Sequence, residues 1–503
     1  MFNKNLLKGK PISYKKLKYA TFLNGLNTDI DEYILPINYS VKTYNYNISN
    51  GALQTGLGVK TMQLPIDKNC SSYKTIEFKN CEVKASWVYR FTISTNTTSR
   101  DDFLVFLTTE GKLVAMPVYG SSTTLIECSN VVFTDIPTVL NYRLNGQYVL
   151  LISSVNGLYF WDVANSNNAT KVENAPQINS ICLHNERAFA TVGGNREQVW
   201  FSKELDPTNW NPTLEEGGFI TFADDKGQCN KVVSFLDRVY IFRDYGINSI
   251  SAYANQTEFL VNDLFVSSGQ IKANTVCVCG DRIIMLTDNG LYCFDGSNTS
   301  KLNLYINNLL SKSNNQHAIA TFFNGKYYLA CNIDFGDGKN VGDEGDYNQQ
   351  NNNALIELDI ASNTINILRG VNITGLNVIS DDIYSKLGVC LLHNGEYRFG
   401  ELSMCGEVFS NPTSKLWMSP LSDFGYPEKN KILNDIFITS KHPLTITIRT
   451  EKISKKVTLS PKNNLIYYSP KVVGKQIAID FESFGSLAYI SNPKIIVGLQ
   501  WDQ

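Results

Sequence analysis

The sequence is poor in the residue types that most often build catalytic and metal sites. It has four histidines, and none lies with another His or with Cys at the spacing of a metal site. It also has no C-x-x-C pair, no P-loop, no dinucleotide-binding glycine fingerprint and no G-x-S-x-G elbow. We therefore predict no catalytic residues, no cofactor-binding residues and no metal ligands, and we expect that the protein is not an enzyme.

An excess of one charge and long apolar runs are also lacking. The chain has 45 Lys and Arg against 47 Asp and Glu, a net charge of -2, whereas proteins that bind nucleic acid through bulk electrostatics carry a strong basic excess. No run of about 18 apolar residues occurs, so no membrane segment is expected. The basic residues 1–18 lack the apolar stretch of a secretory signal. The 11 scattered cysteines fit buried free thiols of a protein made in a reducing cytoplasm.

Short runs of Val, Ile, Tyr, Phe and Thr, separated by Gly, Asn and Asp, are abundant and predict an all-β fold. Two series of turns, exemplified by Asn145-Gly146 and Asn156-Gly157, recur about every 44 residues, which is the period of propeller blades. Each repeat then holds two consecutive hairpins, that is, a four-stranded antiparallel meander. We predict a β-propeller of about seven blades over residues 85–409. Two packed sandwiches in series are the alternative.

The two ends of the chain differ from this repeat. Residues 410–503 contain cleanly alternating strands, such as Leu444, Ile446 and Ile448 on one face, and predict a small C-terminal antiparallel β-sandwich. Residues 1–84 fit neither part and are predicted to be an extended N-terminal arm. A helix is expected only at about residues 302–313.

An acidic insertion interrupts the sixth repeat at Asp334 to Asn353. Its carboxylates, Asp334, Asp337, Asp343, Glu344 and Asp346, are oxygen ligands that suit calcium, but the spacing of an EF-hand is absent. We expect a long solvated hairpin loop. The sequence leaves calcium binding open.

The N-terminal arm combines lysines with scattered apolar residues. Without a strand or helix period, it cannot alone offset a backbone ordering cost of about 1–2 kcal/mol per residue. We therefore expect it to order by docking on a partner; a solvated tail is the alternative. The residues predicted to contact a partner are Lys4, Lys8, Lys10, Lys15, Lys16, Lys18, Phe22, Leu23, Leu35 and Ile37.

Short phrases along the chain resemble bacteriophage tail-hub proteins, which include the packaged-DNA stabilisation proteins of short-tailed phages. Tyr33-Ile34-Leu35-Pro36-Ile37-Asn38, followed by Asn50-Gly51-Ala52-Leu53 and Gly56-Leu57-Gly58, resembles the start of these proteins. Gln198-Val199-Trp200-Phe201-Ser202 with Asp206-Pro207-Thr208-Asn209-Trp210 resembles a phrase inside their propellers. Asp423-Phe424-Gly425 with Lys431 resembles their C-terminal sandwiches. The acidic insertion and the length of the C-terminal sandwich depart from the pattern.

The resemblance implies a structural virion protein of the phage tail hub or neck, made in the cytoplasm of a bacterial host. It would form a homo-oligomeric ring of six copies below the portal and adaptor, in contact with these and other tail proteins. The ring would retain or conduct the genome until ejection, and DNA would pass through its lumen without sequence-specific binding. The alternatives are a tail-tip adhesin or receptor-binding propeller that recognises host surface glycan, and a propeller glycoside hydrolase with a close carboxylate pair in its central funnel.

Overall fold

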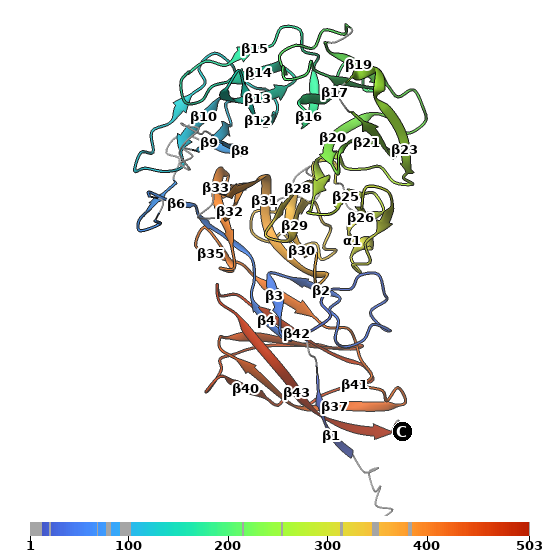
Figure 1. Cartoon of the computed structure of the whole chain (residues 1–503). Helices are drawn as coiled ribbons and strands as arrows, with labels where there is room; N and C mark the ends of the chain where they lie inside the picture. Colours follow the sequence, from blue (N-terminus) through green and yellow to red (C-terminus); the bar gives the residue numbers. More distant parts are fainter. Residues whose placement is uncertain are drawn as a thin grey trace, which may run out of the picture.

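The computed structural model describes residues 13–19, 22–67, 69–76, 82–90, 102–213, 216–252, 255–311, 315–344, 352–380 and 385–501. Figure 1 shows two parts, a circle of sheets and, below it, a body that contains the C-terminal strands. Nearly all regular elements are strands, which confirms the all-β class. The described helices are α1 (Asn307–Ser311), which lies within the expected 302–313 helix, and the 3-10 turns η1 (Gln256–Glu258) and η2 (Ala273–Thr275). None of them has the length and hydropathy needed to cross a membrane.

Five consecutive four-stranded antiparallel meanders form most of the circle. The first is β8 (Val83–Tyr89), β9 (Phe103–Thr108), β10 (Leu113–Pro117) and β11 (Ile126–Glu127), and the second is β12 (Thr138–Leu144), β13 (Gln147–Ser154), β14 (Gly157–Trp161) and β15 (Thr170–Lys171). The third is β16 (Ile178–His184), β17 (Arg187–Val192), β18 (Gln198–Phe201) and β19 (Gly218–Thr221). The fourth is β20 (Cys229–Phe235), β21 (Arg238–Arg243), β22 (Gly246–Ser251) and β23 (Leu260–Val266), and the fifth is β24 (Cys277–Val278), β25 (Ile283–Thr287), β26 (Gly290–Phe294) and β27 (Thr299–Lys301).

Several of the predicted turns join these strands as two-residue hairpin loops. Between β12 and β13, Asn145 and Gly146 have φ values of 49° and 83°. Two consecutive positive φ values define the type I′ turn, whose twist matches that of antiparallel strands. The Asn-Gly pairs at 145–146, 324–325 and 394–395, which share these φ signs, therefore mark hairpins for a steric reason.

A nine-stranded sheet completes the circle. Its order is β28 (Ile319–Phe323), β29 (Lys326–Cys331), β30 (Asn352–Asp359), β31 (Thr364–Ser380), β32 (Ser385–His393), β33 (Glu396–Ser403), β5 (Gly58–Thr61), β34 (Glu407–Val408) and β35 (Asn411–Pro412). The first part of β31 pairs with β30 and its last part with β32, and the register shifts between Ile373 and Gly375. One long strand therefore belongs to two successive meanders.

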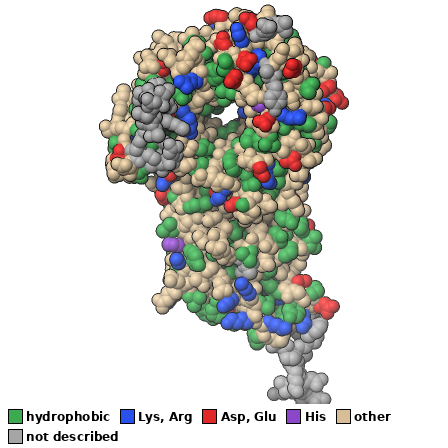
Figure 2. Space-filling model, in the orientation of Figure 1, with side chains coloured by type: hydrophobic (Ala, Val, Ile, Leu, Met, Phe, Trp, Pro, Cys, Tyr) green, Lys and Arg blue, Asp and Glu red, His purple; other side chains and the backbone are tan. Residues whose placement is uncertain are grey.

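The circle closes where the last sheet meets the first. β8 packs against β31, β32 and β33, and the rings of Phe106 and Phe399 lie 5.1 Å apart. The hairpin of β6 (Gln63–Pro65) and β7 (Tyr73–Thr75) flanks this contact, with Leu64 buried in the shared core. Since similar apolar clusters lie between neighbouring sheets around the circle, each sheet buries both faces. The arrangement is a β-propeller, and Figure 2 shows an opening at its centre.

The lower part of the molecule, here called the C-terminal body, consists of two sheets around one core. The seven-stranded sheet has β3 (Tyr46–Ser49), β4 (Ala52–Thr55), β43 (Tyr489–Trp501), β37 (Lys429–Ser440) and β40 (Leu465–Tyr468), with β1 (Ser13–Lys18) on β43 and β41 (Val472–Gly474) on β37. The five-stranded sheet has β2 (Lys42–Tyr44), β36 (Lys415–Met418), β42 (Ile477–Ser483), β38 (Leu444–Thr450) and β39 (Ser454–Leu459). Leu444, Ile446 and Ile448 all lie in the core, as their alternation predicts.

The described N-terminal residues are not a separate arm, so this prediction for residues 1–84 is corrected. β1, β3 and β4 pair within the seven-stranded sheet, β2 pairs with β36, and β5 pairs with β33 of the propeller. Phe22 is fully buried and packs edge-on against Trp417 at 5.1 Å. The physical reason is that β1, β2, β4 and β5 obtain backbone hydrogen bonds from strands more than 300 residues away, so no local period reveals them.

Candidate interaction surface

The lysines of β1 lie at the end of the C-terminal body farthest from the propeller (Figure 1). β1 runs antiparallel to β43, with Leu17 opposite Ile495 and packed on the core. Because side chains alternate along a strand, Lys16 and Lys18 lie on the outer face. Figure 2 shows Lys and Arg side chains gathered at this end of the molecule.

Lys18 stands directly opposite Lys494 of β43. Like charges opposite each other destabilise a sheet, and within the described part of the chain neither lysine has an ion pair with a carboxylate. On the other face of β1, the Lys15 ammonium lies 5.3 Å from the ring centroid of Tyr426, and the Lys429 ammonium lies 5.4 Å from the same centroid. This concentration of positive charge suits an anionic partner.

Aromatic side chains continue the row of Lys18 and Lys494 across the sheet. Lys494 is opposite Phe437 of β37, and Phe437 is opposite Tyr467 of β40. The two rings lie 5.2 Å apart, and Tyr467 is 56% exposed. We call Lys16, Lys18, Lys494, Phe437 and Tyr467 the lysine face.

The structure separates the predicted partner-contact residues into three groups. Lys15, Lys16 and Lys18 lie at the exposed end described above. Phe22 and Leu35 are buried, so these two predictions of a partner contact are corrected, whereas Ile37 is partly buried and packs on the core of the C-terminal body. Leu23 is 60% exposed. Lys4, Lys8 and Lys10 lie outside the described residues.

Residues 27–40, here called the bridge loop, connect the propeller with the C-terminal body. On the propeller side, the Thr28 N–H donates to the carbonyl of Tyr305 at 2.8 Å, and the Asn308 N–H donates to Asp29 Oδ1 at 3.0 Å. On the other side, Glu32 forms an ion pair with Arg449 at 2.9 Å, and Ser40 Oγ donates to the carbonyl of Met418. Both ends of the loop are therefore fixed.

Arg449 is the centre of a mostly buried polar cluster beneath the bridge loop. Its Nε donates to Asp480 at 2.7 Å, and its Nη2 donates to the carbonyl of Ser419 at 2.6 Å. Asp480 also accepts the Ser419 N–H. Burial raises the pKa of Asp480 to about 6, and the hydrogen bonds from Arg449 offset only part of this effect.

The bridge loop exposes apolar side chains although its backbone is fixed. Tyr33 is 63% exposed and Ile34 is 75% exposed. The turn that presents them is held by Asp31, whose side chain accepts the Tyr33 N–H and whose carbonyl accepts the Ile34 N–H. Large apolar side chains held in solvent by an ordered turn are typical of interaction sites.

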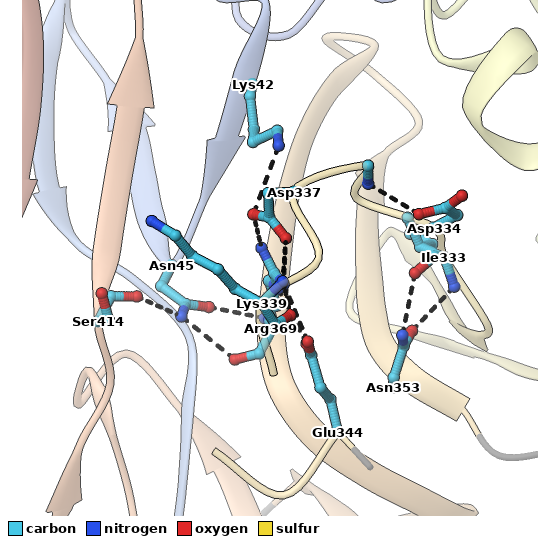
Figure 3. A network of polar contacts seen from close by, with 11 residues as sticks. Lys42, Asn45, Ile333, Asp334, Asp337, Lys339, Glu344, Asn353, Arg369 and Ser414 are labelled. Carbon is cyan, nitrogen blue, oxygen red and sulfur yellow. Dashed lines mark hydrogen bonds and ion pairs between the residues drawn. The ribbon is translucent and has the colours of Figure 1, made fainter. Parts of the chain in front are cut away.

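The acidic insertion is tied to the rest of the chain by Arg369 of β31 (Figure 3). Arg369 is 1% exposed and donates to both Asp337 and Glu344, with nearest distances of 2.7 Å and 2.9 Å. Lys42 of β2 also reaches Asp337, at 3.4 Å. Burial alone would raise the pKa of Asp337, but the hydrogen bonds from Arg369 and from the Lys339 N–H outweigh it and lower the pKa to about 2.

The prediction of a solvated hairpin is therefore corrected for the described part of the insertion. Phe335 packs into the propeller core, and the Arg369 guanidinium lies 4.1 Å from its ring centroid. Asn353 is buried and accepts the Ile333 N–H. The sequence signal that could have indicated this is an arginine inside the apolar run of β31, which requires buried carboxylates nearby.

Contacts with other side chains occupy three of the five carboxylates considered for calcium. Asp337 and Glu344 bind Arg369, and Asp343 lies 2.6 Å from His393. Asp346 is outside the described residues. Among the residues that the structure does describe, no group of three or more potential metal ligands is brought together.

The central opening of the propeller is lined by the first strand of each meander. Adjacent first strands contact one another, as β12 and β16 or β16 and β20 do. Strands β8, β12, β16, β20, β24, β28 and β31, all fully described, contain no Asp or Glu. A carboxylate pair for glycoside hydrolysis would have to come from the connecting loops.

Comparison with known proteins does not identify a family for this chain. No protein-family model and no curated protein matches the chain. Among solved structures, the designed protein Ika8 is 9% identical with a TM-score of 0.38, over 65% of this chain and 98% of its own. Hsv2 of Kluyveromyces lactis is 10% identical with a TM-score of 0.35, over 63% and 93%. The N-terminal domain of Nup159 is 10% identical with a TM-score of 0.37, over 69% and 95%. Likeness at this level carries no argument about function.

Proposed function

We propose that the protein is a structural component of a bacteriophage tail, a hub or neck protein that assembles with copies of itself into a ring. In this proposal the propeller has seven blades: five separate meanders, and two more in the nine-stranded sheet, β28–β31 and β31–β33 with β5. The C-terminal body is a sandwich of the seven- and five-stranded sheets. The last blade takes one strand from the N-terminal part, which closes the propeller.

The observation that carries the proposal is where the phage-like phrases lie. Gly56-Leu57-Gly58 is the point at which the chain passes from the C-terminal body into the propeller. A Cβ at Gly56 would lie 2.1 Å from the carbonyl oxygen of Asn45, and one at Gly58 would lie 2.2 Å from that of Glu407. Only glycine allows such close backbone approach.

Two other phrases include connecting segments of the fold, the bridge loop and the β18–β19 connection of the third meander. The phrase that begins at Tyr33 is part of the bridge loop. Asp206 caps the turn of the second phrase through the Thr208 N–H, and Trp210 is fully buried with its Nε1 donating to the carbonyl of Pro207 at 2.7 Å. Residues used to join parts of a fold support a structural role, since a catalytic role would need reactive side chains at these positions.

A ring of six copies below the portal and adaptor is the assembly that this role requires, with the genome passing through the lumen of the ring in the virion. Electron microscopy of virions labelled with antibodies against this protein tests the proposal. We expect label at the tail, below the portal. Virions that lack the protein, or label confined to another particle component, would contradict it.

A tail-tip adhesin is the second candidate, favoured by one aromatic platform. Trp200 and Phe219 stand opposite each other on the third meander with ring centroids 5.0 Å apart, and Phe219 is 44% exposed. Gln198 accepts the Trp200 Nε1–H. Glycan binding that Phe219→Ala abolishes, with label at the tail tip, would favour this candidate over the hub.

A further inference from the structure

We propose that the bridge loop of one copy docks on the lysine face of a second copy, through Asp29, Asp31, Tyr33 and Ile34 on one side and Lys16, Lys18, Lys494, Phe437 and Tyr467 on the other. The inference rests on the proposed ring and names the contact that would build it.

The bridge loop offers negative charge next to exposed apolar surface. Asp29 and Asp31 are exposed, and their carboxylates accept backbone N–H groups, so no cation within the described residues neutralises them. Glu32, between Asp31 and Tyr33, is in contrast paired with Arg449. The charge of the loop that remains available to a partner is therefore that of Asp29 and Asp31.

The lysine face complements the bridge loop, because positive charges on one side of it are followed by aromatic rings on the other. Lys16 and Lys18 stand at the edge of the sheet, Lys494 is next, and Phe437 and Tyr467 follow across two more strands. Carboxylates placed near Lys18 and Lys494 would relieve the repulsion of these opposed charges. Tyr33 and Ile34 would then meet the Phe437–Tyr467 rings and bury apolar area on both sides.

The two surfaces lie at different places on one copy. The bridge loop, in blue, lies at the side of the molecule between the propeller and the C-terminal body, whereas β1 lies at the far end of that body (Figure 1). Contact between them across two copies is therefore heterologous. A heterologous contact that repeats from copy to copy either closes into a ring or extends into a filament.

The bridge loop is suited to docking because its backbone is already ordered before a partner binds. Its backbone is held by the Tyr305 and Asn308 contacts on the propeller and by Arg449 on the C-terminal body. A surface that is already ordered loses less conformational entropy on binding than a flexible one.

The test uses full-length protein and two sets of charge changes. The first variant, Lys16→Glu/Lys18→Glu, makes the lysine face acidic. The second, Asp29→Asn/Ile30→Lys/Asp31→Asn, makes the loop basic while the Asn side chains keep an oxygen for the backbone N–H groups. Lys171→Glu/Lys301→Glu, on the exposed strands β15 and β27 of the propeller, is the matched control.

Self-association is measured by analytical ultracentrifugation, with circular dichroism to confirm folding. We expect each variant alone to associate at least about tenfold more weakly than the unmodified protein, since like charges then face each other. An equal mixture should recover association to within about threefold, because each loop then meets a face of opposite charge. The control should associate normally.

Two results would overturn the inference. If either variant alone associates as the unmodified protein does, the contact lies elsewhere, although a ring and the hub role could still stand. If both variants are weakened but their mixture is not restored, the two surfaces do not meet each other. An unmodified protein that stays monomeric at all concentrations and at low salt would instead contradict the ring itself.

Discussion

At the scale of single residues, Asp480 makes the stability of the C-terminal body depend on pH. Its pKa is raised by burial from 3.8 to about 6, so the folded state binds this proton more tightly than the unfolded chain. The stability that Asp480 contributes is fully present below pH 3.8 and is lost as the pH rises through about 6. A shift of this size corresponds to at most about 3 kcal/mol.

Asp480→Asn should remove this dependence. We expect the free energy of unfolding of the variant, relative to that of the unmodified protein, to increase between pH 4.5 and pH 7, because only the unmodified protein loses the Asp480 contribution; urea unfolding measures this. The exposed Asp225→Asn is the control and should change nothing with pH. Parallel pH profiles for the unmodified protein and Asp480→Asn would contradict the assignment.

Arg369 is the second residue with a large expected effect. Replacing it by Leu leaves Asp337 and Glu344 without their cation in a buried site, and breaking one side of such a pair costs about 3–5 kcal/mol. Arg398→Ala is the control, since the ion pair of Arg398 with Glu396 is exposed and such pairs contribute about 0–1 kcal/mol. Denaturant unfolding of both variants measures the difference, and equal losses would show that the Arg369 network does not hold the insertion.

At the scale of elements, the joint between the propeller and the C-terminal body depends on Gly56. Gly56→Ala would place a methyl group against the backbone of Asn45, which cannot move without disturbing β2 and β3. We expect a clear fall in the thermal midpoint of unfolding. Gly194→Ala is the matched control because nothing lies within 4 Å of its added Cβ. A Gly56→Ala variant as stable as Gly194→Ala would mean that the joint can relax.

The sequence predicts those elements whose signals are local. Alternation in Leu444, Ile446 and Ile448 and the Asn145-Gly146 turn each follow from a few neighbouring residues, and the structure contains both. The pairing of β1, β2, β4 and β5 with the rest of the fold could not be predicted, because their partner strands lie far along the chain. The burial of the carboxylates around Arg369 was missed for the same reason. A solvated acidic loop and an acidic loop that pairs with a buried cation have the same kind of sequence, and only the fold shows that Arg369 lies beside this one.

At the scale of the whole molecule, the N-terminal residues link everything else. They supply β1, β3 and β4 to one sheet, β2 to another and β5 to the propeller, and the bridge loop contacts both parts between them. Such a chain path joins the propeller and the C-terminal body at several points, which suits a component that must keep its shape within a larger assembly.

Cryo-electron microscopy of the purified full-length protein, at concentrations where it associates, tests this account most directly. The account predicts closed rings of six copies in which the bridge loop of each copy lies against β1 and β43 of its neighbour. Monomers at every concentration, or rings in which the lysine face stays exposed to solvent, would contradict it.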